Sequence, residues 1–228
     1  MENLEKNYVI AIDGEAGTGK STLAKLLAKK LGIVYMDTGA MYRCVTLDMI
    51  NKNIDITDLE GVEKILNNIN IEIKNECGED KVYLNGQEVT KKIRESQVNE
   101  LVSKVSHIPI VRNHMVELQR KTAIGKKIVM EGRDIGTNVF KDAKVKVYLS
   151  ASAEVRAQRR LLQNKEKGIS ISYEEIYNNV IARDNEDKNS NVAPLKKAED
   201  AVEIDTTLIT IDETLEKLMK LVKERVDI

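Results

Sequence analysis

Short apolar runs of strand length and longer amphipathic stretches alternate along the chain. The continuous apolar runs stand at residues 8–12, 33–36, 127–130, 145–149 and 201–204. Continuous rather than alternating apolarity is typical of strands covered on both faces, as in a parallel sheet. Helical patterns fall between the runs, from about 20 to Gly32, from about Ala40, from 153 to 167, from 173 to about 183 and from 212 to 226. This alternation predicts a three-layer α/β fold around a five-stranded parallel sheet.

Residues 56–106 depart from this pattern. A helical pattern at 59–69 precedes short strand-like runs at 71–74, 81–84 and 87–89, and Asn85-Gly86 stands between the last two runs. An Asn-Gly pair in that position is a strong signal for a β-hairpin. We therefore expect a small antiparallel subdomain inserted into the α/β core.

Length, charge and cysteine content narrow the class of protein. The chain has 228 residues, which suits one large domain or a domain with an insertion. Its 36 Lys and Arg residues balance 37 Asp and Glu residues, which argues against a general nucleic-acid-binding protein. Cys44 and Cys77 are too few for a disulfide framework and indicate reduced thiols. Since neither a signal peptide nor a membrane-spanning stretch is evident, we expect a cytoplasmic protein without membrane association.

The most specific motif follows the first strand run. Residues 14–21 match G-x-x-x-x-G-K-[ST] without a mismatch, between a strand run and an amphipathic helix. Such a loop aims successive N–H groups at one anion, and the helix adds the positive end of its dipole. We expect Lys20 to reach the β- and γ-phosphates and the Ser21 hydroxyl to ligate Mg²⁺; a glycine-rich turn without a ligand is the alternative. The predicted triphosphate-binding residues are Gly14, Glu15, Ala16, Gly17, Thr18, Gly19, Lys20, Ser21 and Thr22.

Two segments at the carboxyl ends of later strand runs predict further anion binding, because a doubly wound sheet presents ligands at that edge. In the first, at residues 37–43, Thr38 is expected as a helix N-cap with Arg43 one turn into the helix. In the second, Arg133 and Asp134 follow a strand, where the guanidinium can make a two-pronged contact with a phosphate. A plain helix start with a solvated Arg43, and an Arg–Asp pair bracing a loop, are the alternatives.

A cluster of arginines predicts a lid. Arg156, Arg159 and Arg160 share faces of one helix, and Arg183, Asp184 and Asp187 stand on the helix that returns after a polar loop at 163–172. Closure of such arms brings guanidinium groups over a transferring phosphoryl group and replaces water. A solvated basic face is the alternative.

The three arginine sets indicate that several phosphates meet in one cleft. A phosphate-monoester acceptor is already anionic and needs no general base, so catalysis is then positioning and charge neutralisation. A hydroxyl acceptor would normally need a carboxylate base, and Asp37 or Asp134 could serve.

These motifs resemble, in their order and over nearly the whole chain, those of bacterial cytidylate kinases. The shared strings are the phosphate loop, residues 37–43, Glu131-Gly-Arg-Asp-Ile-Gly-Thr137, Arg156-Ala-Gln-Arg-Arg160 and residues 192–200. The resemblance implies a single P-loop kinase domain, with a core at about 1–37, 107–155 and 184–228, a nucleoside-monophosphate-binding insert at about 38–106 and a helical lid at about 156–183. It also implies transfer of the γ-phosphoryl group of ATP, with Mg²⁺, to CMP or dCMP. We expect the protein to be a cytoplasmic monomer with no nucleic-acid or membrane partner.

The resemblance assigns roles position by position. Lys20, Arg133, Arg156 and Arg160 are the predicted catalytic residues. Thr38, Arg43 and Arg133 would hold the acceptor phosphate, Ser103, Arg112 and Asp134 would read the cytosine, and Arg183 and Asp187 would reach phosphate and ribose. A carboxylate that accepts from the cytosine amine, with Ser and Arg as donors to the ring, would disfavour uracil. Without the resemblance, Ser103 and Arg112 would be interpreted as a polar pair on a helix surface.

Three positions depart from the family pattern. Ser190 stands where the family has Arg, which bears on the nucleotide site, and Lys188 could replace that Arg only as a point charge. Glu15 and Ala16 replace Pro and Ser, and the Glu15 carboxylate is expected to point to solvent. Another P-loop kinase of small molecules, or a nucleotide-binding regulator without catalysis, stay as alternatives.

Overall fold

The computed structural model describes residues 7–76, 79–166, 168–190 and 192–226. They divide into two compact units, one made of residues 1–35 and 123–228 and the other of residues 36–122. Cys77 lies outside the described residues, and Cys44 is a buried free thiol. Across the described ranges, no helix is both long and apolar enough to cross a membrane.

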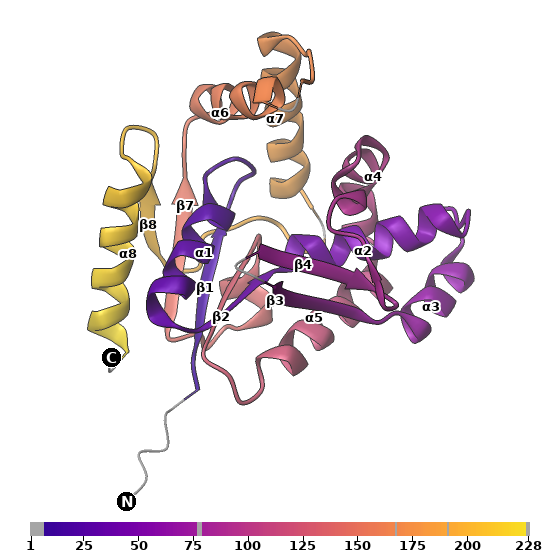
Figure 1. Cartoon of the computed structure of the whole chain (residues 1–228), viewed down its shortest axis with the longest axis horizontal. Coiled ribbons are helices and arrows are strands. Elements are labelled where there is room, and N and C mark those ends of the chain that lie inside the picture. Colours follow the sequence, from indigo (N-terminus) through magenta and orange to yellow (C-terminus); the bar gives the residue numbers. More distant parts are fainter. Residues whose placement is uncertain (1–6, 77–78, 167, 191, 227–228) are drawn as a thin grey trace, which may run out of the picture. The chain divides into compact units, whose positions relative to one another are not determined.

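The first unit is built on a five-stranded parallel sheet of order β2-β6-β1-β7-β8 (Figure 1). The strands are β1 (Val9–Gly14), β2 (Val34–Asp37), β6 (Ile128–Gly132), β7 (Val145–Ser150) and β8 (Val202–Asp205). The central strand β1 pairs with both neighbours in parallel, Ile10 facing Val129 on one side and Val145 on the other. The predicted sheet is thus confirmed, because each continuous apolar run became a strand.

Two helices of the first unit, α1 (Lys20–Leu31) and α8 (Ile211–Arg225), pack on the sheet. Their apolar stripes form one core with alternate residues of β1 and β7, including Leu27, Leu218 and Ile12. Gly32 ends α1 with φ +65°, and Thr210 begins α8 with a capping box. The sheet and these helices hold the loop at residues 14–21 between β1 and α1.

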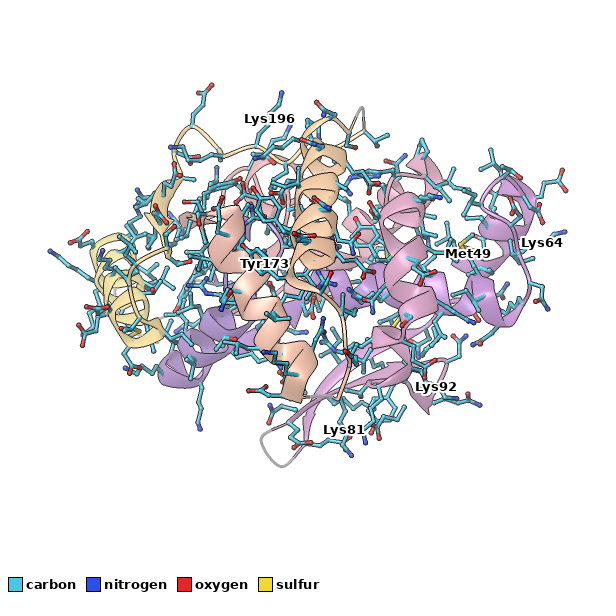
Figure 2. All side chains as sticks on the ribbon, turned by 90° about the horizontal axis from the view of Figure 1, so that it is seen from above. Met49, Lys64, Lys81, Lys92, Tyr173 and Lys196 are labelled. Carbon is cyan, nitrogen blue, oxygen red and sulfur yellow. The ribbon has the colours of Figure 1, made fainter. Side chains whose placement is uncertain are left out.

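The helices α6 (Ala153–Glu166) and α7 (Tyr173–Lys188) pack against each other through Ala157, Ile176 and Val180. Tyr173, labelled in Figure 2, stacks on the ring of Tyr177. The sequence predicted that α7 ends near residue 183, whereas the helix runs to Lys188. A π-helical turn, η2 (Ile135–Val139), follows β6.

The second unit holds α2 (Thr38–Asn51), α3 (Leu59–Asn68), the 3₁₀ turn η1 (Lys92–Arg94), α4 (Ser96–Ser106) and α5 (Pro109–Ala123). Its antiparallel sheet consists of β3 (Ile71–Glu76), β4 (Glu79–Leu84) and β5 (Gln87–Glu88). Asn85 and Gly86 both have positive φ between β4 and β5, as the hairpin prediction requires. The unit extends over residues 36–122, beyond the insert expected at about 38–106. Ser103 and Arg112 do lie on helices, α4 and α5, whose bounds were not predicted.

Candidate functional site

The phosphate loop at residues 14–21 takes a conformation that glycine permits. Gly14 has φ +148°, and a Cβ atom there would collide with the backbone carbonyl oxygen of Leu149 in β7. Gly17 has φ +84°, and a Cβ atom there would stand 3.3 Å from the Cβ atom of Arg156 in α6. Residues with side chains rarely adopt such φ values. The loop is therefore packed against the end of β7 and against α6.

The remaining loop positions show what the loop offers to a ligand. Gly19 is the N-cap of α1 with φ +94°, so the first N–H groups of the helix have no side-chain cap. Thr18 is buried and its hydroxyl donates to the carbonyl oxygen of Glu15 at 3.1 Å. Ser21 and Thr22, in the first turn of α1, are exposed. A helix start with uncapped N–H groups is an anion-binding site.

Lys20 lies inside this loop, with 5% of its surface exposed. Its Nζ atom donates to the carbonyl oxygen of Glu15 at 2.6 Å. Burial, and next the positive charge of Arg133, lower the pKa of Lys20 to about 7, even though two buried carboxylates act in the opposite direction. Arg183 also lowers this pKa. Lys20, Arg133 and Arg183 therefore form a group of like charges that an anion would relieve.

The two buried carboxylates are Asp13 of β1 and Glu131 of β6, neither of which was predicted as a site residue. Asp13 accepts hydrogen bonds from the backbone N–H groups of Ile135 at 2.8 Å and Gly136 at 2.7 Å. Burial raises the pKa of Asp13 to about 6 against these two bonds. Glu131 accepts from the hydroxyl of Tyr35 at 2.8 Å. The two Asp13 bonds fasten the turn after β6 to β1, the strand that leads into the phosphate loop.

Two predicted arginines are held by carboxylates of α7. The Nε atom of Arg133 donates to Asp187 at 2.8 Å, and although burial opposes the charge, Asp187 raises the pKa of Arg133. Arg156 binds Asp184 through two hydrogen bonds of 2.9 and 2.6 Å, with both side chains buried. The same guanidinium donates to the carbonyl oxygen of Ala16 at 3.3 Å. Arg156 is thus not part of a solvated basic face, which was the alternative. Its contacts join α7 to the phosphate loop.

A third ion pair on this face of α7 corrects the expectation for Glu15. Its carboxylate does not point to solvent, because only 8% of the residue is exposed. Its Oε1 atom lies 3.2 Å from the Nζ atom of Lys188. Asp184, Asp187 and Lys188 are three and four residues apart and so share one helix face. Sequence spacing could not reveal that a carboxylate in the loop has its partner at the end of α7.

The other two arginines of α6 take different roles. Arg159 donates to the hydroxyl and carbonyl oxygens of Thr206 at 3.2 and 2.7 Å. The Thr206 hydroxyl in turn donates to the carbonyl oxygen of Thr18 at 3.1 Å, which ties the end of β8 to the loop. Arg160 is half-buried, and among the described residues its guanidinium makes no hydrogen bond or ion pair. Arg160 is therefore the most available of the three for a ligand.

The second unit contains the residues expected to hold an acceptor phosphate. Thr38 is not the N-cap of α2, because Asp37 takes that place and its side chain accepts from the N–H group of Ala40 at 3.0 Å. Either residue type can cap, and Asp37 is the last residue of β2, where the extended backbone suits a cap. Arg43 is half-buried and donates to Asn99 at 2.5 Å. Arg43 is therefore fixed by α4 rather than solvated.

The predicted cytosine-reading residues of this unit also have defined surroundings. Arg112 is 7% exposed, with its guanidinium 5.7 Å from the centre of the Tyr42 ring. It donates to the carbonyl oxygen of Ser106 at 3.4 Å, and the hydroxyl of Ser106 donates to the carbonyl oxygen of Ser103 at 2.8 Å. The interpretation of Arg112 as a polar residue on a helix surface is thus wrong, because its side chain is buried. Tyr42 was not predicted as a site residue, although it lies in the segment 37–43 beside Arg43.

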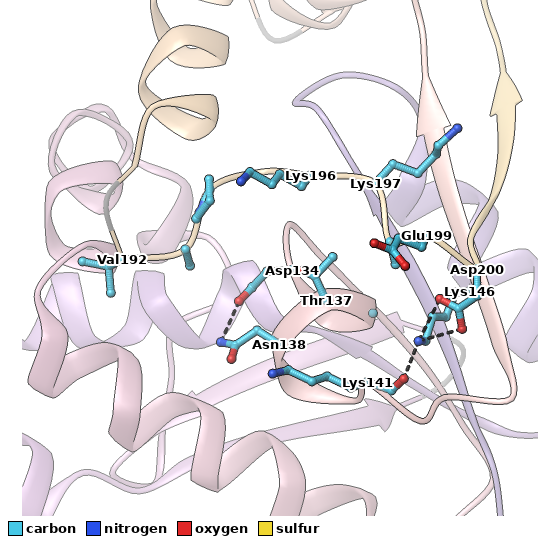
Figure 3. Close-up of a pocket in the computed structure, with 14 residues that line it drawn as sticks. Asp134, Thr137, Asn138, Lys141, Lys146, Val192, Lys196, Lys197, Glu199 and Asp200 are labelled. Atoms are coloured by element: carbon cyan, nitrogen blue, oxygen red, sulfur yellow. Dashed lines mark hydrogen bonds and ion pairs between the residues drawn. The ribbon is translucent and has the colours of Figure 1, made fainter.

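Asp134 borders a pocket of about 530 Å³ between the turn after β6 and the segment that joins α7 to β8 (Figure 3). Asn138 donates to Asp134 at 2.9 Å, which orients the carboxylate. In the same lining, the buried Lys146 pairs with Asp200 at 2.8 Å. Pockets of this size accept small molecules. Asp134 is 5% exposed and belongs to a lining that mixes both charges.

Comparison with known proteins finds relatives over nearly the whole chain. A family model described as cytidylate kinase covers residues 10–224. A cytidylate kinase of Fusobacterium nucleatum is 48% identical over 218 residues, which are 96% of this chain and 98% of that protein. A cytidylate kinase of Thermotoga maritima is 42% identical over 221 residues, which are 96% of this chain and 99% of that protein.

A solved structure of a gluconokinase from Sinorhizobium meliloti has a TM-score of 0.50 at 12% identity and covers 96% of this chain and 94% of that one. This likeness shows a shared kinase fold and no more. The family model and the close relatives extend over nearly the full length and include the phosphate loop, the turn after β6 and α7. The resemblance drawn from the motifs is confirmed, and the chain belongs to the cytidylate kinase family.

Proposed function

We propose that this protein transfers the γ-phosphoryl group of ATP to CMP or dCMP and releases ADP with CDP or dCDP. The observation that carries the proposal is Lys20, which is buried in the phosphate loop. The like charges of Arg133 and Arg183 disfavour its ammonium, so an anion bound there would be stabilised. Family membership gives the reaction class, and the relatives' name gives cytidylate as the acceptor.

The donor triphosphate binds in the phosphate loop. The uncapped N–H groups after Gly19 and the ammonium of Lys20 face the β- and γ-phosphates. Mg²⁺ keeps most of its water and takes a few protein and phosphate oxygens, and the exposed hydroxyl of Ser21, next to Lys20, suits such a ligand. Bound there, the ion would neutralise charge on the phosphate oxygens.

The acceptor is proposed to bind through the residues that the family resemblance assigns to it. Thr38 and Arg43 hold its phosphate, with Arg43 oriented by Asn99. Ser103, Arg112 and Asp134 read the cytosine, since a carboxylate accepts from the exocyclic amine and repels the carbonyl of uracil. Arg183 and Asp187 contribute to phosphate and ribose. The second unit, residues 36–122, is longer than the insert expected at about 38–106. The proposal gives this unit the role of binding the monophosphate and assigns residues of about 156–183 to a lid.

Phosphoryl transfer between these ligands needs no proton abstraction. An oxygen of the acceptor phosphate attacks the γ-phosphorus as the bond to the bridging β-oxygen breaks, and charge spreads over the equatorial oxygens. Lys20, Arg133, Arg156 and Arg160 act in this step by position and charge, with Arg133 and Arg156 oriented by Asp187 and Asp184. A hydroxyl acceptor with Asp37 as base has less support, because Asp37 caps α2.

The test is an acceptor panel. Purified protein with Mg-ATP is offered CMP, dCMP, UMP, AMP and shikimate, and ADP formation is followed with a coupled assay. We expect kcat/KM to be highest for CMP or dCMP. Faster turnover of any of the other acceptors overturns the substrate assignment, and ADP formation that does not depend on an acceptor overturns the reaction class. The same panel in a D134N variant is expected to narrow the preference for cytidylate over uridylate by at least about tenfold.

A further inference from the structure

The phosphate loop carries a buried negative charge at its second position. The side chain of Glu15 is 10% exposed, and its Oε1 atom lies 3.2 Å from the Nζ atom of Lys188. Its Oε2 atom is buried and has no hydrogen-bond partner within the described part of the chain. A loop that must receive a triphosphate therefore holds a carboxylate in its own wall.

The field of this carboxylate reaches its neighbours. Burial, and next the charge of Glu15, raise the pKa of the phenol of Tyr148, which is 8% exposed in β7. Like charges in such partly buried surroundings repel more strongly than in water. An uncompensated Glu15 would accordingly weaken the binding of any polyanion in the loop.

Lys188 is placed to supply the compensation. It is the last residue of α7, and its side chain is 50% exposed. The helix face that carries it is fixed by the pairs Asp184–Arg156 and Asp187–Arg133, at 2.6 and 2.8 Å. The ammonium is thus held beside the loop by a helix that is itself anchored to the loop. Ser190 is neutral and adds no charge here, and its hydroxyl accepts from the N–H groups of Val192 and Ala193 at 3.4 Å.

We propose that Lys188 is a positioning residue for the phosphoryl donor, which acts by neutralising Glu15 so that the phosphate loop accepts a triphosphate. The inference rests on the proposed function in so far as the donor is ATP. Lys188 and Glu15 act as one unit, in which the lysine removes the repulsion between the glutamate and the donor.

The two side chains therefore have opposite effects on donor binding. Affinity for a non-hydrolysable β,γ-imido analogue of ATP is measured by calorimetry without an acceptor, for the wild type, K188M, E15Q and the double variant. We expect K188M to raise Kd about three- to tenfold and E15Q to lower it about threefold. The double variant should match E15Q within about twofold, because Lys188 has no charge to neutralise once Glu15 is replaced. K220M, which removes an exposed lysine from α8, is the matched control and should not change Kd. K188R should restore wild-type affinity.

Steady-state kinetics give a second readout. K188M should raise KM for ATP with less than about a twofold change in kcat, and the rise should shrink as salt screens the charges. If K188M and E15Q both weaken donor binding, the pair is only a structural tie and the proposal is wrong. If K188M has the same effect with and without E15Q, Lys188 acts independently of Glu15 and the proposal is also wrong. Failure of the wild type to phosphorylate CMP would overturn the proposed function but leave these binding results interpretable.

Discussion

Because the Lys20 ammonium is buried, we predict that ATP binding is coupled to the uptake of a proton. Its pKa is about 7 in the free protein against an ordinary 10.5, so placing the charge there costs about 5 kcal/mol. A triphosphate supplies the opposite charge and raises this pKa again. Binding must then take up a proton at any pH between the two values. With a pKa of about 7, the free protein carries only about 0.1 proton on Lys20 at pH 8, so uptake should be about 0.9 proton per ATP bound.

Calorimetry in buffers of different ionisation enthalpy measures this uptake. At pH 8 the phosphate groups of ATP are ionised, as is Asp13 with a pKa of about 6, so Lys20 is the group that titrates. The wild type should show uptake near one proton, and affinity should fall about tenfold per pH unit above pH 7. K20R keeps the charge on a group that stays protonated and should bind without uptake. No uptake by the wild type, or equal uptake by K20R, would refute this description of the loop.

Three further predictions follow from buried groups around the loop. The pKa of Asp13 is raised from 3.8 to about 6, so its contribution to stability is present below pH 4 and is lost as the pH rises through 6. Between pH 4 and pH 7.5, urea unfolding should show the wild type losing about 2.5 kcal/mol of stability relative to D13N. G14A should lose at least about 100-fold in kcat/KM, because its Cβ atom would meet the Leu149 carbonyl, and retention of wild-type turnover would contradict the close packing. R156A leaves Asp184 buried and unpaired and should lower the free energy of unfolding by about 3–5 kcal/mol, whereas the double variant R156A/D184A should be more stable than R156A.

The strands and the loop could be predicted because their signals are local. Each core strand is a continuous apolar run, and the phosphate loop has fixed residue types at fixed spacing. The bounds of α4 were not predicted even though Val98, Val102 and Val105 have helical spacing, because its other positions are mostly polar and the nearby hairpin signal was stronger. The end of α7 was placed too early since the segment after Arg183 is almost entirely polar, and its burial depends on ion pairs with other elements.

The site residues that sequence analysis missed act through partners distant in the chain. Asp13 is a site residue because η2 turns two N–H groups toward it, and no local pattern announces that turn. Glu15 was expected in solvent because a carboxylate in a phosphate loop has no local partner, and Lys188 becomes its partner only when α7 is in place. The motif fixes where phosphate binds, whereas the tertiary structure fixes the charges around it.

Phosphorus NMR of the reaction product tests the central claim most directly. Purified protein is incubated with ATP, Mg²⁺ and CMP until ADP accumulates, and the spectrum of the cytidine product is recorded. Transfer to the acceptor phosphate predicts two phosphorus resonances that couple to each other through a shared oxygen, as in CDP. A product with two uncoupled phosphate monoesters, which marks transfer to a sugar hydroxyl, or ADP and inorganic phosphate with CMP unchanged, would contradict the account.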